Sequence, residues 1–372
     1  MLNRFYFESV KHKYIFFAKE FIIIMKKFLL ILCIIAALAS VSYAKETPEV
    51  SLVRWNSGAS GNVLLTIAEK KGYFDEVGIK LEEVPATANA SAMTLLSTGM
   101  VDVVSNAGTS NPLQQIAAGV DLTIFGGHMM TGAMPIIAKK GVKWEGVKDL
   151  IGKKFACNPS YFALTGAVLD LGYAKPLEAL DWVVITNYND ALAAVIRGEV
   201  DYALQGTEQN YTIKNVNKDN VEIMCYMSDI MPAYSCCRME AQTEFVKKNP
   251  VTIKLILKAL LRAQSYYESH KEEAAQWHAE KIRAEKEFVE AYMFDEHYRV
   301  SADPLLKSIV RAWKILDATG FLSETAKNIN IVDHVNIELY RQALKEASDE
   351  YGSEAPEFYK KMQAFFEENN TL

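Results

Sequence analysis

The strongest constraint on the fold is a pattern that occurs twice in the sequence. Residues 96–106 read LSTGMVDVVSN, and residues 195–206 read VIRGEVDYALQG. Each copy predicts the end of an apolar helix, a glycine, a Val-Asp pair and a short apolar strand. Glycine readily adopts the left-handed conformation that ends many helices, so Gly99 and Gly198 mark the two turns. The pattern therefore predicts two strand–helix–strand units with parallel strands.

The two units indicate a ligand site between two α/β lobes. Further strands are expected at 81–85 and 182–186, and each is followed by a polar loop and a helix. The carboxyl ends of parallel strands meet at one edge of a sheet, where ligands bind. With one unit in each lobe, a cleft that holds a small molecule is expected. Any α/β protein contains several such units, however, so the repeat alone does not fix the function.

The length and charge of the chain agree with a two-domain protein of this kind. Its 372 residues allow two domains, and a net charge of −6 gives no basic excess for nucleic-acid binding. We expect residues 45–133 plus 241–372 to form the first lobe and residues 134–240 the second. Two strands that cross near 130–135 and 233–237 would form the hinge. The region after Asn249-Pro250 reads as amphipathic helices, and a monomer is expected.

Residues 25–44, MKKFLLILCIIAALASVSYA, have the pattern of a secretory signal peptide. Two lysines precede an apolar run, and small residues stand at the cleavage positions. We expect cleavage after Ala44, export to the periplasm and a true start at Met25; whether residues 1–24 are translated stays open. An uncleaved membrane anchor is the alternative, although the apolar run is short for a bilayer span. A lipid anchor at Cys33 would need a small residue where Leu32 stands.

The loops after the expected strands carry mainly hydroxyl and amide side chains. Several of these loops precede helix N-termini, where free N–H groups and the helix dipole favour an anion. The expected ligand-binding residues are Asn56, Ser57, Asn89, Ser91, Asn106, Thr109, Ser160, Tyr161, Tyr188, Gln205 and Glu208. The same residue types also serve as ordinary turn and cap residues. Glu208 would repel an anion and could instead hold an amine.

The sequence contains no pattern that indicates catalysis or a cofactor. It lacks a nucleophile–base arrangement, a GxxxxGK loop and a metal-ligand pair on a helix. His128 together with nearby Met and Cys residues would suit copper, but the spacing matches no metal motif. Arg54 and Arg238 could pair with a ligand carboxylate or form structural ion pairs. We therefore expect no catalytic residue, metal or cofactor.

Four cysteines follow the expected cleavage site. They are Cys157, Cys225, Cys236 and Cys237. An even number of cysteines in an exported chain permits disulfides, but their connectivity cannot be read from the sequence.

Several segments resemble one known family in the same order along the chain. LTIAEKKGYFDEVGIKLEEV (65–84) resembles the A-x-x-KGYF-x-x-x-G-[IL] opening of the nitrate/sulfonate/bicarbonate class of ABC-transporter solute-binding proteins. LLSTGMVDVV, QQIAAGVDLTIFGG, VKDLIGKKFAC and ALAAVIRGEVDYALQG resemble later motifs of that class, so the likeness covers most of 50–240. It implies a type II periplasmic binding fold: two α/β lobes joined by a two-strand hinge. It also implies capture of a small, often anionic solute for a membrane permease and its ATPase.

The same superfamily offers other functions. It includes the yeast-type pyrimidine synthase of thiamine biosynthesis, an enzyme with a Cys-rich iron-site motif. Here only Cys236 and Cys237 stand adjacent, so that motif is not reproduced, and the signal peptide also argues against this enzyme. A pyrimidine-binding protein and a ligand-sensing module for a membrane kinase are the remaining alternatives.

Overall fold

The computed structural model describes residues 25–26, 46–58, 60–86 and 91–372. Apart from Met25 and Lys26, the expected signal peptide lies outside the described residues. Thr47–Leu372 form one compact unit, and the fold described below is that of this unit. In the described ranges, the helices are too short or too polar to cross a membrane.

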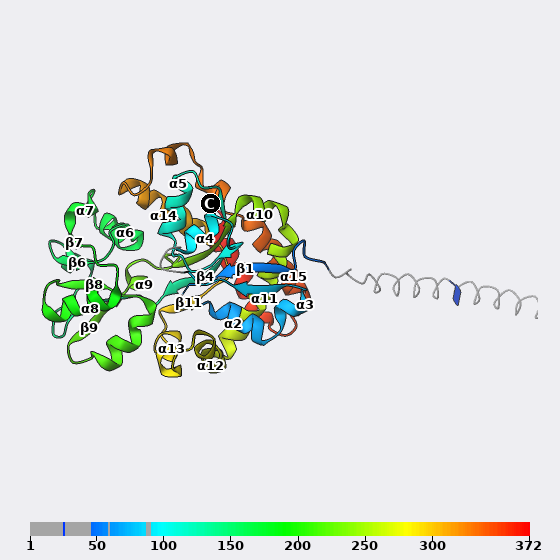
Figure 1. Ribbon diagram of the computed structural model, residues 1–372, viewed down its shortest axis with the longest axis horizontal. Coiled ribbons are helices and arrows are strands. Elements are labelled where there is room, and N and C mark those ends of the chain that lie inside the picture. Colours follow the sequence, from blue (N-terminus) through cyan, green and yellow to red (C-terminus); the bar gives the residue numbers. More distant parts are fainter. Residues whose placement is uncertain (1–24, 27–45, 59, 87–90) are drawn as a thin grey trace, which may run out of the picture. The chain divides into compact units, whose positions relative to one another are not determined.

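The first sheet has six strands in the order β11-β4-β10-β3-β1-β2 (Figure 1). Its strands are β1 (Leu52–Asn56), β2 (Lys80–Glu83), β3 (Val103–Val104), β4 (Leu122–Gly132), β10 (Cys237–Gln242) and β11 (Tyr298–Val300). Strand β1 pairs in parallel with β2 and β3, as the first copy of the repeat predicts. Strand β10 is antiparallel to β3 and β4. The amino end of β10 therefore lies at the same edge as the carboxyl ends of β1 and β3.

The second sheet has five strands in the order β7-β6-β8-β5-β9. They are β5 (Pro135–Lys139), β6 (Lys154–Ala156), β7 (Asp181–Val183), β8 (Tyr202–Leu204) and β9 (Val221–Tyr226). Strand β6 pairs in parallel with β7 and β8, whereas β5 is antiparallel to β8 and β9. The second copy of the repeat therefore also forms a parallel unit.

The two Val-Asp pairs have the same structural role in both sheets. Gly99 (φ 70°) follows α4 (Ala92–Ser97), and Gly198 (φ 78°) follows α8 (Tyr188–Arg197), so both glycines adopt the expected left-handed turn. Asp102 then accepts a hydrogen bond from the Arg54 backbone N–H at 2.8 Å. Asp201 accepts one from the Lys154 backbone N–H at 2.9 Å. In each sheet the aspartate thus satisfies an N–H group on the neighbouring parallel strand.

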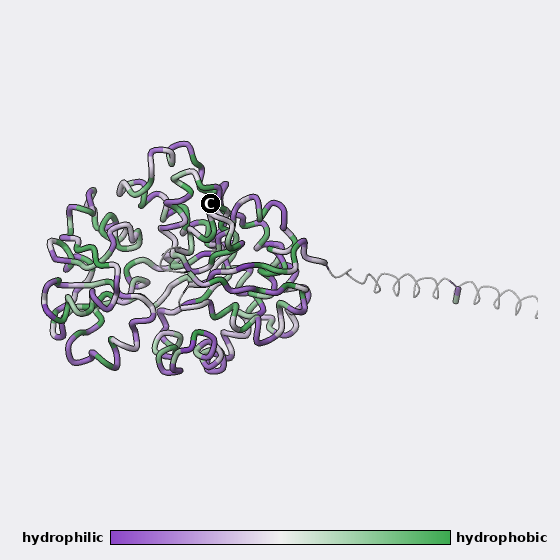
Figure 2. The backbone as a smooth tube through the Cα atoms, viewed as in Figure 1, coloured by the Kyte–Doolittle hydropathy of each residue, from purple (hydrophilic) through white to green (hydrophobic). Residues whose placement is uncertain are grey.

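Helices cover both sheets, and the C-terminal region is helical as expected. The helices not yet given are α2 (Val63–Lys70), α3 (Tyr73–Glu76), α5 (Ser110–Ala117), α6 (Phe162–Asp170), α7 (Pro176–Ala179), α9 (Met227–Ile230), α10 (Thr243–Lys248), α11 (Pro250–Ser269), α12 (Lys271–Ile282), α13 (Lys286–Met293), α14 (Leu306–Ala318), α15 (Ile337–Tyr351) and α16 (Pro356–Asn370). Short 3-10 or π turns are η1 (Val147–Leu150), η2 (Thr207–Gln209), η3 (Thr212–Val216), η4 (Glu324–Asn328) and η5 (Ile331–His334). Helix α11 packs against α2 and α15, and α14 packs against α6. Hydrophobic residues run along the strands, whereas the outer turns are more hydrophilic (Figure 2).

The chain passes between the two sheets twice. It leaves the first sheet after Gly132 at the end of β4 and enters the second at Pro135, and it returns between the end of β9 and the start of β10. Strand β4 is long because it continues to this crossing. Ala133, Ala233 and Ser235 have positive φ angles of 47°, 50° and 63°. Such angles are unfavourable for residues with a Cβ atom, so backbone strain gathers at the two crossings. The lobe boundaries expected from the sequence stay a prediction.

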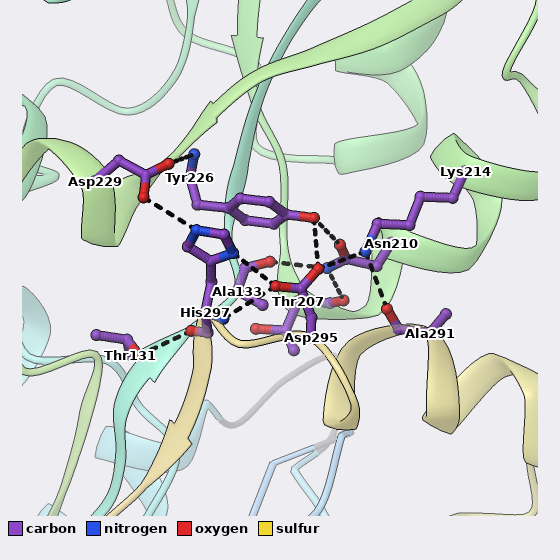
Figure 3. A network of polar contacts seen from close by, with 10 residues as sticks. All are labelled: Thr131, Ala133, Thr207, Asn210, Lys214, Tyr226, Asp229, Ala291, Asp295 and His297. Carbon is purple, nitrogen blue, oxygen red and sulfur yellow. Dashed lines mark hydrogen bonds and ion pairs between the residues drawn. The ribbon is translucent and has the colours of Figure 1, made fainter.

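A polar network beside the crossings connects elements of both sheets (Figure 3). We call it the crossing network; it consists of Thr131, Ala133, Thr207, Asn210, Lys214, Tyr226, Asp229, Ala291, Asp295 and His297. The Asp295 carboxylate, before β11, accepts hydrogen bonds from Lys214 Nζ at 2.6 Å and from the Tyr226 hydroxyl at 2.9 Å. His297 contacts the carboxylates of both Asp295 and Asp229, at 2.6 and 3.0 Å. The network therefore links β11 and α13 to the turns that follow β8 and β9.

Candidate functional site

A cavity of about 540 Å³ lies where loops from the two sheets meet. Its residues come from the β1–α2 loop, the β3–α5 loop, α5, the end of β4, the β6–α6 loop, the start of α8, the turn after β8 and both crossings. They are Ser60, Asn106, Ala107, Gly108, Thr109, Ser110, Asn111, Gln114, Met129, Met134, Asn158, Ser160, Tyr161, Phe162, Tyr188, Gly206, Thr207, Glu208, Tyr234, Cys236 and Cys237. A cavity of this size holds a small molecule.

Two helices begin at the cavity, one from each side. Helix α5 follows the first sheet's β3, and α6 follows the second sheet's β6; the first residues of both line the cavity. The Thr109 side chain does not cap α5, because it donates its hydrogen bond to the Ser235 carbonyl at 2.5 Å. The Tyr161 side chain does not cap α6. The first N–H groups of both helices are thus left without a cap from these residues, and they can bind an anion.

A hydrogen bond joins the two sides at this point. The Ser110 hydroxyl, at the start of α5, donates to the Ser160 carbonyl at 2.9 Å. Ser160 is fixed in turn, because its backbone N–H donates to the Asn158 side chain at 3.0 Å. The N-termini of α5 and α6 are therefore held close to each other.

Tyrosine rings line another part of the cavity. The ring centroids of Tyr161 and Tyr234 are 6.4 Å apart, and the Tyr161 hydroxyl donates to Met134 Sδ at 3.0 Å. The Tyr234 hydroxyl accepts a hydrogen bond from the Gly132 N–H at 3.0 Å. Burial raises the pKa of both hydroxyls well above their usual value, and it also raises the pKa of Tyr188. The three phenols are neutral at physiological pH and offer polar groups beside aromatic surface.

Glu208 is the acidic side chain of the cavity. Among the described residues that line it, there is no Lys, Arg or His. Burial raises the pKa of the Glu208 carboxyl, because the charged form loses its hydration. The carboxyl and the Tyr188 ring both lie over Gly206, where an added Cβ would come within 2.6 Å of either side chain. A glycine is therefore needed at 206 to bring these two groups to the cavity.

Two thiols and an amide form the wall near β10. The Cys237 thiol donates to Asn106 Oδ1 at 3.0 Å, and the Asn106 amide donates to Ser60 Oγ at 2.8 Å. Cys236 Sγ lies 3.7 Å from Cys237 Sγ and 3.9 Å from Met134 Sδ. All four cysteines that follow the expected cleavage site are free thiols in this structure. In the part of the chain that is described, no group of three or more His, Cys, Asp or Glu is placed to hold a metal ion.

The structure brings together six of the eleven residues expected from the sequence. Asn106, Thr109, Ser160, Tyr161, Tyr188 and Glu208 line the cavity. The other described residues, Asn56, Ser57, Ser91 and Gln205, are not in its lining, and Asn89 lies outside the described residues. A role in ligand binding stays a prediction for all eleven.

The four described residues outside the lining have other local roles or environments. Asn56 donates to the Val84 carbonyl at 2.7 Å, and Ser57 donates to Glu83 Oε1 at 3.1 Å, so both join the end of β1 to the end of β2. Ser91 caps α4 by accepting the Thr94 N–H at 3.3 Å. Gln205 is fully buried, and its amide oxygen and nitrogen have no partner among the described residues.

The arginines and histidine considered from the sequence also lie away from the cavity. Arg54 forms an ion pair with Asp102 at 2.6 Å. Arg238 is fully buried and donates to the carbonyls of Asp303 and Met129. His128 is buried as well, and burial lowers its pKa to about 3, so its ring is neutral. Arg54 and Arg238 therefore bind other parts of the protein, and His128 is a buried neutral side chain.

Sequence reasoning missed the part of the cavity formed by the second crossing. The expected set does not include Tyr234, Cys236 and Cys237, because it contains only loops that follow the carboxyl ends of strands. These residues instead precede β10, whose antiparallel direction brings its amino end to that edge. The available signal was the short run of polar and aromatic residues that directly precedes β10, the strand by which the chain returns to the first sheet.

Comparison with known proteins gives one family and a common fold. The family described as NMT1/THI5 like matches residues 62–274, more than half of the chain. A search of curated proteins by sequence found no match. Among solved structures, the periplasmic aliphatic sulphonate binding protein SsuA from Escherichia coli is 19% identical, with a TM-score of 0.59 over 79% of this chain and 92% of that one. The periplasmic nitrate-binding protein NrtA from Synechocystis PCC 6803 is 17% identical, with a TM-score of 0.63 over 81% and 90%.

An enzyme shares the same fold. The desulfurization enzyme DSZB is 13% identical, with a TM-score of 0.57 over 80% of this chain and 99% of that one. At these identities the likeness shows the fold alone. The fold expected from the sequence, a periplasmic binding protein fold with two sheets and a helical C-terminal region, is confirmed.

Proposed function

Because the chain belongs to the NMT1/THI5-like family, we propose that it is an extracytoplasmic solute-binding protein of an ABC importer that captures a small anion. The observation that carries this proposal is the meeting of the α5 and α6 N-termini at one cavity. Each terminus offers N–H groups and the positive end of a helix dipole. A sulfonate, nitrate or bicarbonate group fits such donors without a basic side chain.

Glu208 is compatible with an anion in its neutral form. Its pKa is raised by burial, so the carboxyl keeps a proton at a higher pH than an exposed glutamate. A neutral carboxyl donates a hydrogen bond to an oxyanion, whereas a carboxylate would repel it. We therefore include Glu208 among the ligand-binding residues of the proposed site.

The arrangement of the cavity also supports capture by closure of two lobes. Its residues belong to both sheets, and the chain crosses between the sheets twice. A ligand that contacts both sides stabilises the closed arrangement over an open one. We propose that residues 45–133 plus 241–372 move as one lobe and residues 134–240 as the other. Export after Ala44, a monomeric state, a permease and ATPase as partners, and the absence of catalysis belong to the same proposal.

A neutral heterocycle such as a pyrimidine is the second candidate ligand. The observation that favours it is the set of aromatic rings in the cavity wall, Tyr161, Tyr188 and Tyr234, all neutral through their raised pKa values. Rings of this type stack on flat ligands and hydrogen-bond through their hydroxyls.

Thermal-shift screening of the purified protein distinguishes the two ligand classes, because ligand binding to the folded state raises the unfolding temperature. The panel comprises methanesulfonate, taurine, nitrate, bicarbonate, uracil, a 4-amino-pyrimidine and simple amines. We expect stabilisation by one or more of the anions. Stabilisation by the pyrimidines alone would replace the anion proposal with the second candidate.

Two variants test whether the cavity is the binding site. Ser160→Phe and Asn106→Phe place a large side chain against the N-termini of α6 and α5 and should abolish the ligand-induced shift. Ser97→Phe is the matched control, because Ser97 is exposed on α4 and does not line the cavity. An unchanged ligand response in both cavity variants would place the site elsewhere.

A further inference from the structure

Cys236 and Cys237 both line the same cavity, although they are adjacent in the chain. Successive side chains of a regular strand point to opposite faces of the sheet. Here β10 begins at Cys237, and its pairing with β4 shifts register between Cys237 and Arg238. The preceding Ser235 has a φ of 63°, which turns the chain before the strand. These irregularities bring the two sulfurs to 3.7 Å from each other.

The surroundings of the two thiols make them chemically different. The contact with the Cys237 sulfur at 3.7 Å lowers the pKa of Cys236, and burial opposes this shift. The same contact raises the pKa of Cys237, and burial raises it further. Cys236 is also the more exposed of the two residues. Because a thiolate is the nucleophile in disulfide exchange, Cys236 is the residue that attacks first.

We propose that Cys236 and Cys237 form an oxidative modification site, in which a small organic disulfide that enters the cavity converts the two thiols into one disulfide. The Cys236 thiolate attacks one sulfur of the small disulfide, and a first small thiolate leaves. The Cys237 thiolate then attacks Cys236 Sγ in the mixed disulfide, and a second small thiolate leaves. The two protons of the protein thiols end on the two released thiols, and the two electrons reduce the small disulfide.

The reaction would change the wall that holds Asn106. A disulfide bond is about 2 Å long, so the two sulfurs must approach each other from their present separation of 3.7 Å. Cys237 would also lose the hydrogen that it donates to Asn106 Oδ1. Asn106 would keep its hydrogen bond to Ser60, and its Oδ1 would be left without the Cys237 donor.

The test uses the full chain with Cys33, Cys157 and Cys225 replaced by serine, so that only Cys236 and Cys237 remain. The folded protein is incubated with bis(2-hydroxyethyl) disulfide near neutral pH, unfolded in acid and treated with a maleimide. We expect no maleimide adduct and a mass lower by two hydrogen atoms in intact-protein mass spectrometry. Treatment with dithiothreitol should restore two reactive thiols. Persistent mixed disulfides on both cysteines, cross-linked dimers or two unreacted thiols would each overturn the proposal.

Single variants in the same background test the order of attack. With Cys236→Ser, the remaining Cys237 should react with the small disulfide at least about tenfold more slowly than Cys236 does in the Cys237→Ser variant, because Cys237 is buried whereas Cys236 is partly exposed. Both variants should stop at a mixed disulfide. Equal rates would overturn the assignment of Cys236 as the attacking residue. Peptide mapping of the otherwise unchanged chain checks that oxidation selects this pair when Cys157 and Cys225 are present.

Discussion

Replacing Asp295 by asparagine removes the charge that the crossing network surrounds. Burial alone would raise the pKa of Asp295, but hydrogen bonds from Lys214, His297 and Tyr226 outweigh it and lower the pKa to about 2 from the usual 3.8. A shift of this size corresponds to about 2 kcal/mol of stabilisation. The Lys214 side chain is 33% exposed, so screening by water reduces the expected contribution to about 1 kcal/mol. Asp295→Asn should therefore lower the free energy of unfolding by about 1–2 kcal/mol at neutral pH.

The pH dependence separates this charge effect from a simple packing defect. A lowered pKa stabilises the folded state above the usual pKa of 3.8, and the stabilisation disappears as the pH falls to about 2. Urea unfolding of both proteins at about pH 7 and about pH 3 should therefore show a smaller difference in acid. Glu296→Gln is the matched control, because Glu296 is exposed and adjacent in sequence. An equal loss at both pH values, or no loss at neutral pH, would refute the role given to the Asp295 charge.

Three further predictions concern other buried groups. Burial raises the pKa of Glu240 well above its usual value, and both of its carboxyl oxygens lack partners among the described residues. The free energy of unfolding should therefore fall as the pH rises above about 4 toward that raised pKa. Glu240→Gln should be more stable by about 1 kcal/mol or more in thermal unfolding at neutral pH, and equally stable in acid. Gly127→Ala should lower the free energy of unfolding in urea by about 3 kcal/mol. The reason is that the added Cβ would overlap Arg238 Nη1 and lie 2.5 Å from two backbone oxygens. An unchanged urea midpoint would contradict this packing. Calorimetric affinity for the best anion of the thermal-shift panel should fall as the pH rises through the raised pKa of Glu208, and Glu208→Gln should remove that dependence.

The fold could be predicted because its signals are local and occur twice. Gly99 and Gly198 fix two helix ends, and Asp102 and Asp201 each satisfy an N–H of the neighbouring strand. These functions need the same residue types at the same spacing, so the sequence displays them directly. The length of β4 could not be predicted from a local signal of this kind. The second half of β4 forms a strand because it pairs with β10 and β11, which are distant in the sequence.

The candidate site was less predictable because side-chain direction depends on single residues. Asn56 and Gln205 both stand at strand ends, as expected, yet Asn56 bonds the end of β2 and Gln205 is buried away from the cavity. A strand alternates its faces with a period of two, so the correct loop does not guarantee the correct side chain. The contribution of Tyr234 depends on the antiparallel return of β10, which the strand–helix–strand pattern does not contain.

The contacts across the cavity also indicate where motion must occur if a solute is to enter. The Ser110–Ser160 hydrogen bond joins the two helix N-termini that we propose as the anion site, so these ends must separate before a ligand can lie between them. Ala133, Ala233 and Ser235 hold unfavourable backbone angles at the two crossings, and a change of those angles would relieve strain while the sheets move apart. The crossing network opposes that change, because Asp295 and His297 bind residues from the second sheet's side. For the lobe motion that we propose, the strain at these three residues favours opening, whereas the crossing network and the Ser110–Ser160 hydrogen bond oppose it.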